Sequence, residues 1–141
     1  MEQGFWLVEP INQPPFNLEE PMALATPRSF LRRIASDYIR YGYYRYVVRT
    51  IPDGKDLEAI DEKLCRIYGV TTCRTTRMRM RRQGLAVVQY LRWHQTFVLL
   101  VTDGFSDSFE RLCSYDIRYT PLHIGSYSIG LRENTVSIQV A

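Results

Sequence analysis

A continuous unit of strand, turn and helix constrains the fold more than any other part of the chain. Residues 43–51 are rich in aromatic and β-branched side chains, which is typical of a β-strand. Pro52-Asp53-Gly54 supplies turn residues directly after it. Asp56 is placed to cap a helix that Gly69 would end. The apolar residues between these two recur at helical spacing and should face the core: Leu57, Ile60, Leu64 and Ile67.

A helix should also precede this unit. Thr26 is a suitable N-cap, Pro27 suits the first helical position, and Gly42 would end the helix. Apolar and aromatic side chains recur through this stretch at helical spacing. We therefore predict one buried stripe, formed by Phe30, Leu31, Ile34, Tyr38 and Tyr41.

The second half of the chain predicts mainly strands. Residues 74–82 alternate in the manner of a strand, and residues 85–91 and 96–102 should form a hairpin joined by residues 92–95. A short helix capped by Ser106 or Asp107 should carry Phe109, Leu112 and Cys113. The expected remaining elements are a strand at 122–131, a turn at 133–135 and a last strand at Val136 to Val140.

The resulting order of strand, helix, strand, strand, helix and strand predicts the fold class. It is the order of a ferredoxin-like β-α-β-β-α-β antiparallel sheet, here with an extra N-terminal helix and a short C-terminal strand. We expect residues 28–141 to form this single α+β domain. Residues 1–27 hold five prolines, four glutamates and no basic residue, and we expect an extended acidic arm there.

Apolar runs are short throughout the chain. The longest, Thr96 to Val101, is far below the roughly 18 residues of a membrane span. The N-terminus lacks the basic and apolar regions of a secretory signal. The three cysteines show neither disulfide nor zinc spacing. We therefore expect a cytoplasmic protein with no membrane contact.

Arginine clustering indicates the class of partner. Residues 28–49 hold six arginines against one aspartate, and seven further arginines lie between Glu62 and Asp103, where no acidic residue occurs. Only Lys55 and Lys63 among the 18 basic residues are lysines. Arginine offers a planar fork for phosphates and a flat face for stacking, which suits nucleic acid.

The densest arginine cluster is residues 74–82. In a strand, Arg77, Arg79 and Arg81 would point to one side, about 7 Å apart, with Met78 and Met80 on the other. Such a row repels itself unless it binds an anion, although it would equally suit an edge strand that uses charge to prevent aggregation. We expect most phosphate contacts from Arg77, Arg79, Arg81 and Arg82, helped by Arg74, Arg45 and Arg49.

Tyrosines alternate with arginines around residues 38–49, as in surfaces that bind single strands. Most of these rings should belong to the core, and we favour Tyr43 as the stacking platform. The sequence thus predicts a domain that binds RNA or single-stranded DNA without a catalytic role. No metal site, P-loop or other cofactor motif is present in the sequence, so no cofactor is expected.

Two other functions remain open. A metal-independent phosphodiesterase or ribonuclease could use His94 and His123 as general acid and base, with Tyr127 or an arginine steadying the phosphate. A protein-interaction module could instead form a homodimer by pairing the exposed strand Val136 to Val140 edge to edge.

Overall fold

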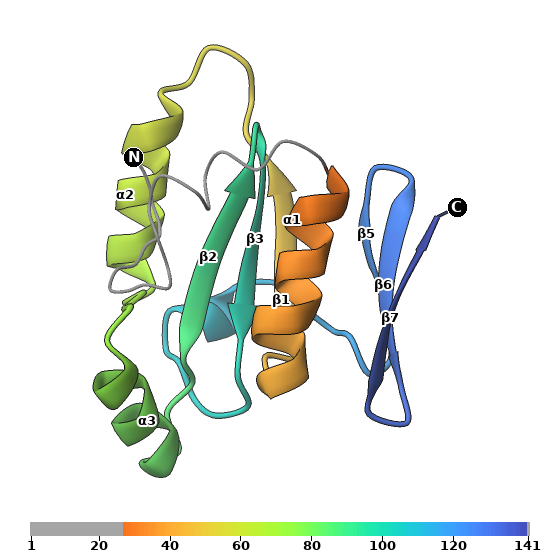
Figure 1. Ribbon diagram of the computed structural model, residues 1–141. Helices are drawn as coiled ribbons and strands as arrows, with labels where there is room; N and C mark the ends of the chain where they lie inside the picture. Colours follow the sequence, from red (N-terminus) through yellow and green to blue (C-terminus); the bar gives the residue numbers. More distant parts are fainter. Residues whose placement is uncertain (1–26, 141) are drawn as a thin grey trace.

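Two antiparallel β-sheets and three α-helices make up the part of the chain that the structure, a computed structural model, describes: residues 27–140 (Figure 1). The expected arm lies outside these residues, apart from Pro27. The helices are α1 (Pro27–Arg33), α2 (Leu57–Ile67) and α3 (Arg74–Arg82), with a 3-10 turn at Phe109–Arg111. The strands are β1 (Arg45–Thr50), β2 (Val88–Trp93), β3 (Thr96–Val101), β4 (Tyr115–Asp116), β5 (Leu122–Ile124), β6 (Tyr127–Arg132) and β7 (Thr135–Val140).

The larger sheet is central and has its strands in the order β2-β3-β1-β4, each antiparallel to its neighbour. β1 runs beside β3 along its whole length, from Arg45 opposite Val101 to Thr50 opposite Thr96. Figure 1 shows α1 and α2 on opposite sides of this sheet. One core layer therefore lies under α1 and includes Leu31, Tyr46 and Leu100, and the other lies under α2 and includes Val47, Tyr90 and Leu99.

The predicted strand-turn-helix unit is confirmed. The Asp56 carboxylate accepts a hydrogen bond from the Ala59 backbone N–H at 3.2 Å, which caps α2. Gly69 follows the end of the helix with φ of +63°, a left-handed conformation that glycine adopts without strain. Ile67, expected in the core, is exposed at the last turn.

A buried ion pair joins α2 to the central sheet. Asp61 is 4% exposed and Arg92 is 8% exposed. The Arg92 guanidinium donates to both Asp61 oxygens, from Nε at 2.7 Å and from Nη2 at 2.9 Å, and the Tyr90 hydroxyl also donates to this carboxylate. Arg92 was expected in the hairpin loop; β2 instead extends to Trp93, and the turn is His94-Gln95.

Residues 27–41 form one helical segment of three parts, which we call the first helical segment. It comprises α1, a π-helical turn at Ile34–Tyr38 and a 3-10 turn at Ile39–Tyr41. Its start at Pro27 and its end before Gly42 confirm the prediction. The predicted burial of Tyr41 is wrong, since that side chain is 61% exposed. A π turn is wider than an α turn, so it changes which later side chains face the sheet.

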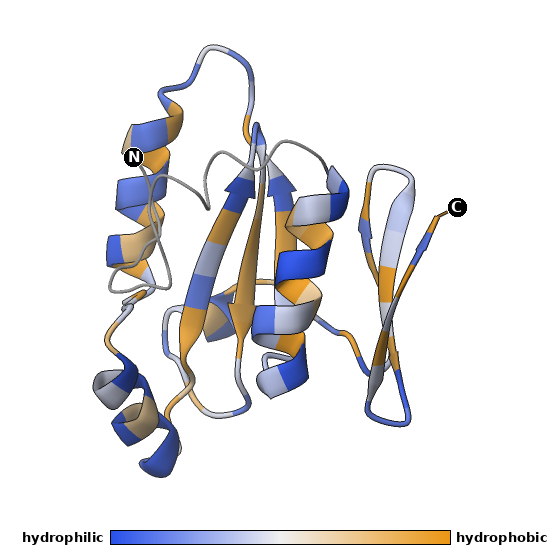
Figure 2. Ribbon diagram, in the orientation of Figure 1, coloured by the Kyte–Doolittle hydropathy of each residue, from blue (hydrophilic) through white to orange (hydrophobic). Residues whose placement is uncertain are grey.

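The predicted strand at residues 74–82 is wrong, because this stretch forms the helix α3. Its nine residues include five arginines, and Figure 2 shows a largely hydrophilic helix. Arginine and methionine are good helix formers, and a helix spreads the five charges around its axis. Met80 packs against the core, whereas Met78 is exposed. The proposed single ladder of arginines is therefore replaced by two helical faces.

The C-terminal residues form a second sheet with the order β5-β6-β7. The single strand expected at 122–131 is wrong, because a turn at Gly125-Ser126 divides it into β5 and β6. The turn before the last strand is confirmed, with Glu133 and Asn134 leading into β7. This sheet contributes Leu122, Ile124 and Ile129 to the core layer under α1.

The α+β class is confirmed, whereas a ferredoxin-like arrangement is not clearly present. The second helix of that order is only a 3-10 turn here. Its N-cap is Ser108 rather than Ser106 or Asp107, although the Ser106 hydroxyl accepts a hydrogen bond from the Phe109 N–H. β4 has two residues, and the second sheet stands apart from the first. Among the described helices, none combines the length and apolar character needed to cross a bilayer.

Candidate nucleic-acid interface

A groove of about 630 Å³ lies between α3 and the first helical segment, and we call it the α3 groove. Four arginines line it: Arg33 of α1 with Arg74, Arg77 and Arg81 of α3. The last three share one face of α3 because residues three, four and seven positions apart lie on the same side of a helix. The structure thus brings together three of the predicted phosphate ligands and adds Arg33, which sequence reasoning did not single out.

Arg79 and Arg82 lie elsewhere on the surface of α3. Both side chains are exposed, and neither lines the α3 groove. Each residue in a helix advances by about 100°, so Arg79 projects to the side opposite Arg74. The helix therefore offers an internal comparison between arginines inside and outside the groove.

Arg81 holds α3 against the first helical segment. Its Nη1 donates to the Tyr41 carbonyl at 3.1 Å, and its guanidinium lies 5.8 Å from the centre of the Tyr43 ring. Gly42 lies directly beside this contact, and a Cβ there would lie 2.8 Å from Arg81 Nη2 and displace the end of that side chain. Arg81 therefore positions the helix as well as contributing charge to the groove.

Positive charge in the α3 groove is largely unneutralised. The single carboxylate among its described lining residues belongs to Asp37, which pairs with Arg33 at 3.6 Å. Burial raises the pKa of Asp37, and the charge of Arg33 partly offsets that rise. None of the ion pairs between residues 27–140 includes an arginine of α3. The Arg77 guanidinium donates a hydrogen bond to the Thr71 carbonyl at 3.3 Å, which leaves its charge unneutralised.

Tyrosines in the groove do not have the exposure that was expected. Tyr43 is 6% exposed and belongs to the core under α1, where burial raises the pKa of its hydroxyl. Its ring therefore has no free face for a base. Tyr41 lines the same groove with an exposed ring. The departure of its segment from regular α-helix explains why the helical stripe misassigned it.

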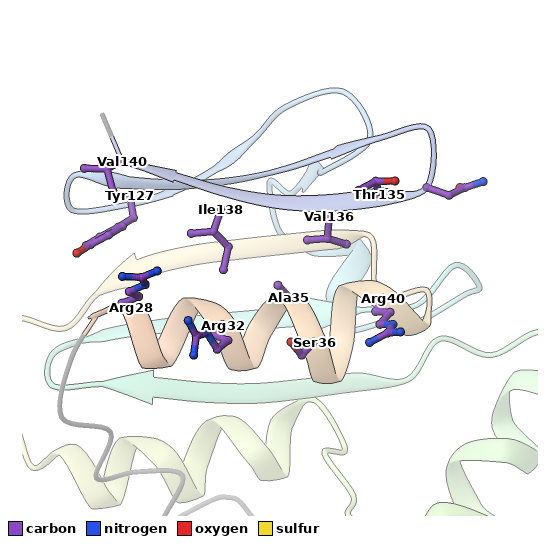
Figure 3. A pocket seen from close by; sticks show the side chains of 11 residues that line it. Arg28, Arg32, Ala35, Ser36, Arg40, Tyr127, Thr135, Val136, Ile138 and Val140 are labelled. Atoms are coloured by element: carbon purple, nitrogen blue, oxygen red, sulfur yellow. The ribbon is translucent and has the colours of Figure 1, made fainter.

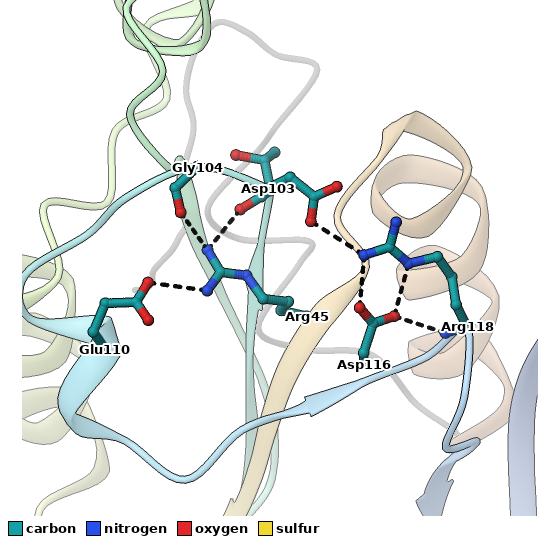
Figure 4. A network of polar contacts seen from close by, with 7 residues as sticks. Arg45, Asp103, Gly104, Glu110, Asp116 and Arg118 are labelled. Carbon is teal, nitrogen blue, oxygen red and sulfur yellow. Dashed lines mark hydrogen bonds and ion pairs between the residues drawn. The ribbon is translucent and has the colours of Figure 1, made fainter.

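Arg45 is a structural residue at the N-terminal end of β1. Its guanidinium donates to Glu110 at 3.0 Å and to the carbonyls of Thr102 and Gly104 at 3.0 and 2.8 Å (Figure 4). Beside it, Arg118 is paired in the same way with Asp116 and Asp103. These interactions leave Arg45 few donors for a phosphate.

Arg49 is exposed but lies far along β1 from α3. It pairs with Phe97, near the β2–β3 turn, whereas α3 leads into the opposite end of β2. Arg49 therefore does not join the cluster around α3.

The structure does not bring the three candidate catalytic residues onto one surface. His94 lies in the turn of the central sheet, and His123 lies in β5 of the second sheet. Tyr127 pairs with Ile124, whereas His123 pairs with Ser128. Paired residues share a face and successive residues alternate, so His123 and Tyr127 point to opposite sides of their sheet.

Metal chemistry has no evident site within residues 27–140, where no three histidine, cysteine or carboxylate side chains gather as metal ligands. The chain matches no known protein-family model, and it has no significant match among curated proteins or solved structures. The assignment of function therefore depends on the geometry and charge of the groove.

Proposed function

We propose that this protein binds nucleic acid, RNA or single-stranded DNA, in the α3 groove. The observation that carries the proposal is the convergence of Arg33, Arg74, Arg77 and Arg81 on one groove whose described lining residues include a single carboxylate, already paired with Arg33. Like charges held this close repel each other in the free protein. A bound polyanion relieves that repulsion and releases its own counterions, which favours binding at low salt.

The groove also offers what a base requires. Tyr41 presents an exposed ring beside the arginines, and stacking on an aromatic ring contributes about 1–3 kcal/mol per base. Stacking on a ring needs unpaired bases, so the combination favours a single strand over a regular duplex. Arg79 and Arg82 would add long-range attraction from outside the groove.

Arg74 and Arg77 allow a direct test, because neither makes the anchoring contact of Arg81. We expect R74Q/R77Q to lower the affinity for a labelled oligonucleotide by about 10-fold or more at about 0.1 M salt. The slope of log K against log salt should fall by roughly 1.4, at about 0.7 for each lost phosphate contact. Fluorescence anisotropy across a salt series measures both quantities.

The matched control is R79Q/R82Q, which removes the same charge from the same helix but outside the groove. This variant should lose only a few-fold in affinity. Y41F should bind as the wild type does, whereas Y41A should lose the stacking contribution. Equal affinity and salt slope in wild type and R74Q/R77Q would refute the proposal.

The ferredoxin-like fold also stays a proposal, confined to the central sheet. The chain order of β1, α2, β2, β3, a helical turn and β4 supports it. We interpret α3 as an insertion before β2 that carries the binding surface.

Self-association is a second proposal, and β7 supports it. This strand is the edge of the second sheet and carries no charged side chain. Natural edge strands usually avoid pairing through charge, proline or bulges, which β7 lacks. Two copies could pair their β7 strands antiparallel about a two-fold axis without repulsion between like charges.

A further inference from the structure

A second groove, of about 590 Å³, lies on the other side of the first helical segment, where that segment faces β7 (Figure 3). We call it the β7 groove. Arg28, Arg32 and Arg40 line it from the helical side, and Val136 and Ile138 line it from β7. Tyr127 contributes an aromatic ring at the end near Arg28 (Figure 3).

The three arginines of this groove form one row. Arg28, Arg32, Ser36 and Arg40 occur at every fourth position, and all four line the β7 groove, so they lie along the same side of the segment. The π turn lies inside this row, and such turns are frequent at functional sites. All three arginine side chains are exposed, and none takes part in an ion pair between residues 27–140.

No carboxylate occurs among the described residues that line the β7 groove. Within residues 27–140, no ion pair accounts for these three arginines, and the strand beside them carries no charge. Their charge is therefore available to an anion, as in the α3 groove.

The two grooves lie on different sides of the first helical segment, and their linings include adjacent residues at its C-terminal end. Arg40 lines the β7 groove, and the next residue, Tyr41, lines the α3 groove. Both side chains are exposed, so both are accessible from solvent at this end of the segment. Arg32 and Arg33 are likewise neighbours in sequence that line different grooves. The segment is thus flanked by arginines on both sides.

We infer that the β7 groove is the second half of the nucleic-acid site, and that the ligand is a single strand that passes around Arg40 and Tyr41 to occupy both grooves. This inference rests on the proposed function of the α3 groove. The row from Arg28 to Arg40 spans about 18 Å of helix, and the arginine face of α3 spans about 10 Å. A strand of roughly six to eight nucleotides would fill both, which is within the range of known single-strand sites.

The inference predicts that affinity depends on the length of the oligonucleotide. Oligothymidylate or oligouridylate of about four nucleotides can occupy one groove, and one of about ten can occupy both. We expect the wild-type protein to bind the longer oligonucleotide at least about 10-fold more tightly than the shorter one.

The variant R28Q/R32Q/R40Q should bind the short oligonucleotide within about 3-fold of wild type but lose most of the gain from length. Its salt slope for the long oligonucleotide should fall by about 2, at about 0.7 for each phosphate contact. The control K55Q/K63Q/R66Q removes the same net charge from α2 and the loop before it. Because α2 packs on the other face of the central sheet, this variant should retain the gain in affinity from the longer oligonucleotide. Circular dichroism melting should show all variants folded, because every substituted side chain is exposed.

The outcomes separate the inference from the proposed function. If R28Q/R32Q/R40Q keeps the full gain from length, the extended site is wrong while the α3 groove can still bind. The single variant R40Q, at the junction, should give part of the same loss. If the wild-type protein binds neither oligonucleotide, both proposals fail. If it binds both equally, only the extended site is refuted.

Discussion

The buried pair of Asp61 and Arg92 should have a large effect on stability. We predict that D61A lowers the free energy of unfolding by about 3–5 kcal/mol. The variant leaves the Arg92 guanidinium inside the layer under α2 without the buried carboxylate that it contacts directly. It also removes the acceptor of two short charge-assisted hydrogen bonds from Arg92 and one from Tyr90. α2 would then lose its polar attachment to β2.

The geometry supports the upper part of this range. Both partners are almost fully buried, so water cannot replace the lost contacts. Burial, and then the Asp61 carboxylate, raise the pKa of the Tyr90 hydroxyl, which therefore remains a donor at neutral pH. Without Asp61, that donor also loses its hydrogen bond to the carboxylate, and a hydrogen bond to a charged group contributes about 1.5–3 kcal/mol.

Urea denaturation followed by circular dichroism measures the effect. The exposed pair of Asp107 and Arg111, with side chains 78% and 79% exposed, provides the control, and D107N should change stability by less than about 1 kcal/mol. D61A/R92M should be more stable than D61A, because no buried charge remains unpaired. A cost below about 1 kcal/mol for D61A, or additive costs in the double variant, would refute the reasoning.

Two further predictions concern the surface. Hydrogen bonding from Arg118 lowers the pKa of Asp116 in the folded protein. The Asp116 carboxylate therefore stabilises the fold at pH values above its unfolded pKa of about 3.9. This stabilisation is lost as the pH falls through the lower pKa of the folded state. D116N should therefore be less stable than wild type by roughly 0.5–1 kcal/mol at neutral pH. The difference in urea midpoint between the two proteins should vanish near pH 2, and a difference that does not change with pH would contradict this prediction. Pairing through β7 should give a mass that rises with concentration in sedimentation equilibrium, and S137K, which adds a charge to the edge, should remain monomeric. A wild-type mass that stays monomeric at all concentrations would exclude the β7 dimer.

Local signals in the sequence were sufficient where they agreed with one another. Asp56, the apolar periodicity after it and Gly69 all mark the same helix, and α2 has those boundaries within two residues. The β2–β3 hairpin was also predictable, because two apolar runs flank a short polar turn at His94-Gln95. These elements depend little on distant parts of the chain.

The sequence predicted most of the arginines of the candidate site but not how they are arranged in space. The sequence of residues 74–82 fits two patterns. The alternation of arginine and methionine is typical of a strand, whereas the spacing of Arg74, Arg77 and Arg81 is typical of one face of a helix. Helix propensity and the packing of the partly buried Met80 against the core favour the helix. Tyr41, and not the predicted Tyr43, has the exposed ring in the groove. This outcome depends on an irregular helical segment, which a regular period of about 3.6 residues does not describe. Arg33 reaches the groove only through tertiary packing, which the sequence does not reveal.

Three arginines of the first helical segment, Arg28, Arg32 and Arg40, have a consequence for how this sequence can diverge. The fold needs the buried side of that segment, where Phe30, Leu31 and Ile34 lie, whereas these three side chains are exposed and form no ion pair between residues 27–140. Stability would therefore let these three positions drift to any helix-compatible residue. If related chains conserve arginine at all three positions, that conservation would indicate selection for ligand binding. Conservation of the buried positions would indicate selection for core packing.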